Sequence, residues 1–165
     1  DSEEEYQERA HRGSCWKEGA FVVSTINING LARDKVEWLA RYVTNNKVDV
    51  LVVVDTRLKD SRAAWTRTEF KRLLGRGVTI VVSSLATGTK DDVPGGVLIL
   101  AMPKVGNAVS VRDDPLKIGS RLTVAFKIGA VVLTVVGMCI SPSNQKVGVE
   151  ERKRAKGSTD GWYGH

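Results

Sequence analysis

Apolar residues along the chain follow two different periods, one typical of buried strands and one typical of helices. Residues 20–28 are rich in Val, Phe and Ile, and residues 48–54 are apolar except for Asp49, so both stretches predict strands that are covered on both faces. Between them, apolar residues recur at helical spacing from Val36 to Val43. This order predicts a β-α-β unit whose two strands lie parallel through a right-handed crossover.

Local signals place the ends of two predicted helices. Asp34, followed three residues later by Glu37, indicates a capping box at the start of the first helix. Ser61 can cap a second helix, which runs to about Leu74 and ends at Gly75. The expected buried residues of that helix are Ala64, Trp65, Phe70, Leu73 and Leu74.

From residue 78 onward, short apolar stretches alternate with turn residues, which predicts strands. Gly129-Ala130 separates the last two stretches and predicts a tight hairpin. We therefore expect this half of the chain to be an antiparallel meander. Its predicted strands span residues 78–83, 96–102, 108–111, 121–128 and 131–140.

Polar side chains follow both strands of the β-α-β unit. Asn27 and Asn29 end the first strand, and Asp55 follows the second. Because the carboxyl ends of neighbouring parallel strands meet at one edge of a sheet, we expect these three residues to lie together there. An ordinary structural explanation exists for each: Asn-Gly is a common turn signal, and an aspartate can cap the turn that follows it.

The composition indicates one soluble domain with a basic surface. The chain has 165 residues, a net charge of +6 and a pI near 9.5, which favours polyanionic partners such as nucleic acid, although a mixed solvated surface explains such a charge equally well. No apolar run approaches the ~20 residues needed to span a bilayer. Cys15 and Cys139 form no disulfide framework, so we expect reduced thiols and an intracellular location, in the nucleus or an organelle.

Several motifs in order carry a resemblance to a known family. They are residues 25–31 (TININGL), 48–58 (VDVLVVVDTRL), 95–99 (GGVLI), 119–122 (GSRL) and 135–144 (VVGMCISPSN). The chain resembles the endonuclease/exonuclease/phosphatase superfamily, and within it the apurinic-type endonuclease domains of non-LTR retrotransposons. The resemblance implies an α/β fold, the first half of a four-layer sandwich, over residues 20–145, between a polar arm (1–19) and a charged tail (146–165).

The resemblance also implies a site. Asn27 and Asn29 match active-site amides of the family, and Asp55 stands where the family has a metal-binding glutamate, with Mg²⁺ as the usual cofactor. Asn144 is a further candidate for a polar catalytic contact. The basic residues that we expect to contact nucleic acid are Arg57, Lys59 and Arg121.

Departures from the family pattern limit the expected activity. Asp55 is shorter than the family's glutamate, and Ile140 replaces a tyrosine. The family's later Gly-Asp-x-Asn-like motif and its closing Asp-His pair do not occur in this sequence, whose histidines are His11 and His165. Without a general base, worth about 100- to 10,000-fold, this sequence alone is not expected to be a competent nuclease.

Three functions remain open from the sequence. The first is part of a metal-dependent DNA endonuclease of retrotransposon type, completed by a missing C-terminal half or by another chain. The second is a non-catalytic basic subunit that binds RNA or protein in a larger ribonucleoprotein assembly. The third is a phosphoesterase that acts on a small molecule or a lipid headgroup.

Overall fold

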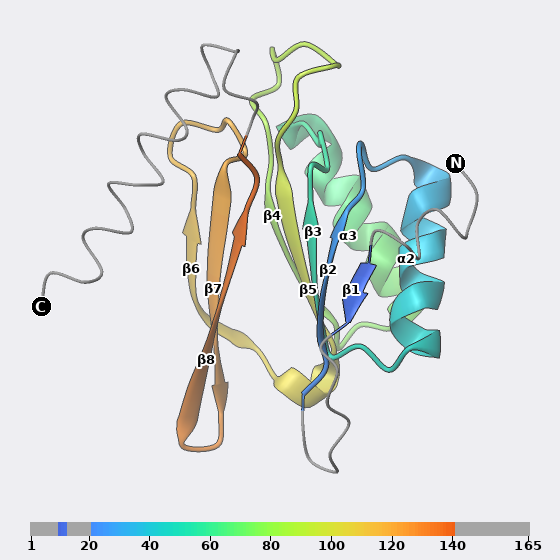
Figure 1. Ribbon diagram of the computed structural model, residues 1–165, viewed down its shortest axis with the longest axis vertical. Helices are drawn as coiled ribbons and strands as arrows, with labels where there is room; N and C mark the ends of the chain where they lie inside the picture. Colours follow the sequence, from blue (N-terminus) through green and yellow to red (C-terminus); the bar gives the residue numbers. More distant parts are fainter. Residues whose placement is uncertain (1–9, 13–20, 141–165) are drawn as a thin grey trace, which may run out of the picture.

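A computed structural model of the protein describes residues 10–12 and 21–140. Two β-sheets stack face to face, and two α-helices cover the outer face of the larger sheet (Figure 1). The helices are α2 (Arg33–Asn45) and α3 (Asp60–Leu74), and a short 3₁₀ helix spans Pro103–Val105. The strands are β1 (Ala10–Arg12), β2 (Val23–Asn27), β3 (Val50–Val54), β4 (Thr79–Ser83), β5 (Val97–Ala101), β6 (Ala108–Asp113), β7 (Arg121–Ile128) and β8 (Val131–Met138).

The first sheet contains the predicted β-α-β unit. Its strand order is β1-β2-β3-β5-β4, and β2 and β3 pair in parallel, with Val23 opposite Val50 and Asn27 opposite Val54. The other pairs, β1 with β2, β3 with β5 and β4 with β5, are antiparallel. The predicted α/β fold class, with a β-α-β unit followed by antiparallel strands, is confirmed.

The helices bury one face of this sheet. Leu39 of α2 and Phe70 of α3 are fully buried in a core that also contains Ile26 and Leu51 from the sheet. Burying side chains of this size stabilises the fold by about 1.5 to 3 kcal/mol each. Tyr42 of α2 also reaches the sheet, because its hydroxyl lies 2.9 Å from Ser24 Oγ in a buried hydrogen bond.

The second sheet covers the other face of the first. Its order is β6-β7-β8, all antiparallel, and its inward side chains Leu122, Val124 and Phe126 pack with Val52 and Ile99 of the first sheet. The strands predicted as one meander are therefore divided between two sheets, since β4 and β5 join the first. The family resemblance also implies that the absent half of the fold builds most of the second sheet, yet three strands of that sheet come from this chain.

One part of the first sheet is left uncovered. In the second sheet, β8 lies over β3 and β5, β7 over β5 and β4, and β6 over β4. On β2, buried side chains alternate with exposed ones, and Val23 is 39% exposed. The prediction that this strand is covered on both faces is wrong, because none of the described strands of the second sheet reaches over it.

The predicted helix caps are also wrong. The residue before α2 is Ala32 and the residue before α3 is Lys59, and neither side chain caps its helix. In α3 the buried side chains are Ala63, Thr66 and Phe70. Of the residues predicted to be buried, only Phe70 is fully so: Trp65, Leu73 and Leu74 are partly buried, and Ala64 is exposed.

The structure bears only in part on the predictions about a membrane span and about the terminal arm and tail. No helix in the part of the chain that the structure describes is long and apolar enough to span a membrane. Most of the predicted arm (1–19) and the whole tail (146–165) lie outside the described residues, although the backbone of His11, in β1, pairs with Thr25 of β2.

Candidate site at the carboxyl ends of β2 and β3

The backbone pairing of β2 and β3 continues past the strand ends. The amide of Ile28 donates to the carbonyl of Val54 at 3.1 Å, and the amide of Gly30 donates to the carbonyl of Asp55 at 2.8 Å. The segment that contains the Asn-Gly turn therefore runs beside the segment that contains Asp55. This pairing places the predicted polar residues at one edge of the sheet.

Three side chains at this edge form one hydrogen-bonded cluster. Arg57 Nε donates to Asp55 Oδ1 at 3.2 Å, and Arg57 Nη2 donates to Asp55 Oδ2 at 3.2 Å and to Asn29 Oδ1 at 2.8 Å. Asp55 is only 7% exposed, and its Oδ1 also accepts the amide of Gly95 at 3.0 Å. A two-point contact of this kind between guanidinium and carboxylate is among the stronger hydrogen-bonded pairs in proteins.

The backbone of the cluster is strained. Asn29, Asp55 and Arg57 have φ angles of 51°, 57° and 53°, in the left-handed region that non-glycine residues avoid. Asn and Asp tolerate this region better than Arg does, and each such residue costs on the order of 1 kcal/mol or more. The amide of Arg57 donates to the carbonyl of Gly95 at 2.8 Å, which helps to hold the strained segment in place.

The glycines of the 95–99 and 119–122 motifs have a structural role beside this cluster. The amide of Thr56 donates to Gly96 O at 3.2 Å, and the amide of Gly96 donates to Gly119 O at 2.8 Å. A Cβ atom on Gly96 would lie 2.3 Å from Thr56 Oγ1, so no larger residue fits. These two motifs join the two sheets at the end where Asp55 lies.

Asn27 and Lys35 complete the edge. Asn27 Oδ1 accepts the amide of Asn29 at 3.1 Å, which is the local turn contact that the ordinary structural explanation predicts. Lys35, in the first turn of α2, donates through Nζ to the carbonyls of Ile28 and Asn29, at 3.0 and 3.3 Å. Sequence reasoning missed Lys35, because nothing in its spacing shows that its side chain folds back to the strand end.

The other predicted site residues are not part of this cluster. Lys59 forms an ion pair with Asp91 in the loop before β5. Arg121 begins β7 next to Leu122, whose side chain faces the first sheet, so Arg121 points to the opposite face. Asn144 lies outside the described residues.

Two loop aspartates also escaped sequence reasoning. Asp114 is buried, and its carboxylate accepts the amides of Leu116, Ile118 and Ser120 at 3.1 to 3.3 Å, which orders the loop before Arg121. Asp91 is exposed, and the hydrogen bond from Lys59 lowers the pKa of its carboxyl group. The apolar pattern used for prediction carries no information about such polar contacts.

The donor set around Asp55 does not fit a divalent cation. Mg²⁺ demands near-octahedral oxygen coordination, usually with one or two carboxylates among its ligands. Both oxygens of Asp55 already accept hydrogen bonds from Arg57. Within residues 21–140, no group of three or more His, Cys, Asp or Glu side chains is placed to hold a metal ion. The role of Asp55 as a metal ligand stays a prediction that this arrangement does not favour.

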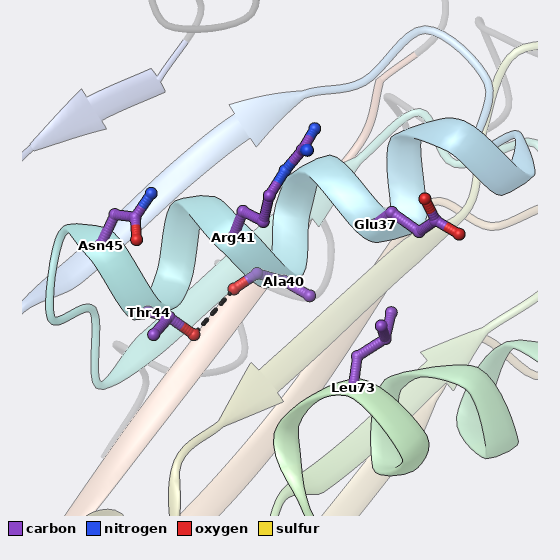
Figure 2. Close-up of a pocket in the computed structure, with 6 residues that line it drawn as sticks. All are labelled: Glu37, Ala40, Arg41, Thr44, Asn45 and Leu73. Carbon is purple, nitrogen blue, oxygen red and sulfur yellow. Dashed lines mark hydrogen bonds between the residues drawn. The ribbon is translucent and has the colours of Figure 1, made fainter.

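A shallow groove elsewhere on the molecule is a weaker candidate. It lies between α2 and α3 and is lined by Glu37, Ala40, Arg41, Thr44, Asn45 and Leu73 (Figure 2). The hydroxyl of Thr44 donates to the carbonyl of Ala40 within the helix, so this polar group is already paired. None of the residues of the strand-end cluster lines this groove.

Comparisons by sequence identify no relative. A scan against protein-family models finds no match. A search of curated proteins finds no match either.

Comparisons by structure identify the fold. The endonuclease domain of TRAS1, a telomere-specific non-LTR retrotransposon, matches with a TM-score of 0.51 and 16% identity over 84% of this chain and 54% of that one. An endonuclease/exonuclease/phosphatase family protein from Leptotrichia buccalis matches with 0.54 and 12% identity, over 85% and 63%. An AP endonuclease from Archaeoglobus fulgidus matches with 0.56 and 15% identity, over 83% and 49%.

These matches show that the chain has the fold of endonuclease/exonuclease/phosphatase proteins. The resemblance to this superfamily, with a retrotransposon endonuclease domain among the matches, is confirmed at the level of fold. The chain spans between 49% and 63% of the length of these three structures. It therefore corresponds to part of that fold.

Proposed function

We propose that this chain is a nucleic-acid-binding part of an endonuclease/exonuclease/phosphatase-type phosphodiesterase of the retrotransposon kind. The observation that carries the proposal is the cluster of Asn29, Asp55 and Arg57 at the carboxyl ends of β2 and β3. Ligands of open α/β sheets commonly bind at this edge. Solved proteins with this fold include endonucleases by title, and a net charge of +6 favours an anionic ligand.

Arg57 is the residue through which we expect the nucleic acid to be held. A guanidinium that is fixed by a carboxylate and an amide is well suited to a phosphodiester oxygen, because it is permanently charged and directional. Contacts with phosphate carry little sequence information, so binding should depend weakly on base sequence and strongly on salt.

The proposal can be tested by fluorescence anisotropy with a labelled oligonucleotide. Arg57→Ala should weaken binding by about tenfold or more, the usual loss for a hydrogen bond with a charged partner. The matched control is Arg76→Ala, which removes the same charge from an exposed residue after α3, near the amino end of β4 and away from the cluster. Equal weakening by both substitutions would show a diffuse charge effect and contradict the proposal.

Hydrolysis by this sequence alone is not part of the proposal. Acid–base catalysis is worth about 100- to 10,000-fold, and residues 21–140 contain no histidine. In a plasmid-nicking assay with Mg²⁺ or Mn²⁺, the wild type should therefore cut no faster than an Asn27→Ala/Asp55→Ala double variant. Cutting by the wild type that the double variant loses would show that the site is catalytic.

We further propose that another polypeptide segment, in the same chain or another one, completes the second sheet. In the described part of the chain β8 pairs only with β7, and its outer side chains Val132 and Val136 are 58% and 48% exposed. The next strand position beyond β8 lies above the uncovered face of β2. A strand added there would pair with β8 and bury Val23 together with it.

The alternative function is a non-catalytic basic subunit of a ribonucleoprotein. The ion pair between Arg57 and Asp55 favours binding over metal-dependent chemistry, and so agrees with this alternative too. The two functions differ in the segment that completes the sheet beside β8. For a nuclease this segment must supply the missing Asp, Asn and His residues, whereas for a structural subunit it need not carry them. Nicking of DNA by the completed assembly would decide for the nuclease.

A further inference from the structure

The strand-end site carries its own cation. We propose that Arg57 replaces a divalent metal at Asp55 and that the site holds a phosphodiester group through this guanidinium without a metal. This inference rests on the proposed function and specifies how the ligand is held.

Asp55 has little capacity left for a metal ion. Its Oδ1 accepts hydrogen bonds from Arg57 Nε and from the amide of Gly95, and its Oδ2 accepts one from Arg57 Nη2. One lone pair is left, on Oδ2, and a cation that used it would lie directly beside the positive guanidinium, which repels it. The side-chain oxygen of Asn29, another possible ligand at this edge, is also hydrogen-bonded to Arg57.

Arg57 keeps donors for a ligand. A guanidinium has five N–H donors, and three of them are used, one on Nε and two on Nη2. The two N–H groups of Nη1 make no hydrogen bond to any residue that the structure describes. The side chain is 29% exposed, so a phosphate oxygen can approach it.

The charges around the site also suit an anion. Asp55 and Arg57 cancel each other, and Asn27 and Asn29 are neutral. Lys35 adds a positive charge, because its ammonium group binds the carbonyls of Ile28 and Asn29. The ammonium group of Lys35 therefore lies at the same strand end as the guanidinium of Arg57.

The guanidinium is held in place before a ligand arrives. Its backbone is fixed by the hydrogen bond from its amide to Gly95 O, and its side chain by Asp55 and Asn29. A Cβ on Gly30 would lie 3.7 Å from Arg57 Cδ, so the turn packs along the arginine stem. Fixing a long side chain in advance reduces the entropy that binding must cost.

The first arm of the test measures binding of a labelled single-stranded oligothymidylate, in EDTA and in Mg²⁺ at matched ionic strength. The wild type should bind with the same affinity in both buffers. Arg57→Ala should bind about tenfold more weakly in both buffers. Arg57→Lys keeps the positive charge but loses the planar, two-point hydrogen bonding of the guanidinium, so its affinity should lie between those of the wild type and Arg57→Ala. Circular dichroism of each variant checks folding, and Arg57→Gln replaces Arg57→Ala if the latter fails to fold. Wild-type binding that requires Mg²⁺ would overturn the inference.

The second arm needs no nucleic acid. Mn²⁺ binding to the full chain is measured by electron paramagnetic resonance for the wild type and for Asp55→Asn, and the two should be indistinguishable. A Mn²⁺ site that Asp55→Asn abolishes would overturn the inference even if the oligothymidylate binds. Absence of oligothymidylate binding in both buffers would overturn the proposed function and, with it, the phosphodiester part of the inference. The Mn²⁺ result would still decide whether Asp55 holds Arg57 or a metal ion.

Discussion

The amide of Gly96 donates to the carbonyl of Gly119 at 2.8 Å, and this contact joins the two sheets beside the strand-end cluster. Gly96 precedes β5 in the first sheet, and Gly119 precedes β7 in the second. The backbones approach so closely that a Cβ on Gly119 would lie 2.2 Å from Gly96 N. The stability of this end of the molecule therefore depends on the absence of a side chain.

Gly119→Ala should destabilise the protein by about 3 kcal/mol or more, since it adds a backbone clash to the strain of a φ angle of 64°. The matched control is Gly129→Ala in the β7–β8 turn, where φ is 60° and no atom lies within 4 Å of the added Cβ. That control should cost only the backbone strain, about 1 to 2 kcal/mol. Urea denaturation measures the free energy of unfolding of both variants. Equal losses of stability would show that a Cβ atom at residue 119 is accommodated without a clash against Gly96.

Asp114→Ala should destabilise the protein by at least about 2 kcal/mol, because it leaves several amides of a buried loop without an acceptor. Asp92→Ala, an exposed aspartate in another loop, is the control and should change the free energy of unfolding by less than about 0.5 kcal/mol. The same denaturation experiment compares them. A loss for Asp114→Ala as small as the control's would refute its role in ordering residues 114–120.

The pKa of Asp91 should lie below the value of about 3.9 that is usual for an aspartate. Because folding lowers this pKa, the Lys59–Asp91 pair stabilises the fold above the unfolded value, and its contribution disappears as the pH falls through the folded value. An NMR titration of the Asp91 carboxyl carbon measures the pKa. Lys59→Met should return it toward the usual value, whereas Lys90→Met, in the same loop, should not. An unchanged pKa in Lys59→Met would disprove the pairing.

Among the described strands β8 pairs only with β7, and this exposed edge should promote self-association of the isolated chain. A charged side chain on an edge strand opposes such pairing, so Val136→Lys should reduce self-association in sedimentation velocity and leave the thermal midpoint nearly unchanged. Val109→Lys on β6 is the control, because the register shift between Ala108 and Ser110 already disrupts that edge. A chain that is monomeric at all concentrations, or equal effects of both substitutions, would contradict the assignment of β8 as the docking edge.

Sequence patterns predicted the β-α-β unit because an apolar run such as residues 48–54 has few alternatives to a buried strand. They failed where structure depends on partners distant in sequence. The late strands are divided between two sheets because β5 pairs with β3, which is distant in sequence. Likewise, β2 is exposed because none of the described strands of the second sheet lies over it. The local signals at Asp34 and Ser61 suggested caps, but neither helix uses a side-chain cap.

At the site, the strand topology predicted which residues lie together, but the residue types did not predict which groups bind each other. Parallel pairing was enough to bring Asn29 beside Asp55, and the hydrogen bonds through Arg57 confirm that the two lie together. The cation partner of Asp55 could not be predicted, because it depends on left-handed backbone angles at Asp55 and Arg57 that no local pattern announces. Lys35 was overlooked because its spacing does not show that its side chain folds back to the strand end.

The central claim is that nucleic acid binds at the carboxyl ends of β2 and β3 through Arg57, and NMR tests it most directly. The chain, labelled with ¹⁵N, is titrated with a short single-stranded oligonucleotide. The account predicts the largest shift changes at the Arg57 Nε–H and at the amides of Asn29 and Gly95. Changes concentrated instead on the exposed basic residues of α3, Lys71 and Arg72, with the Arg57 signal unmoved, would contradict it.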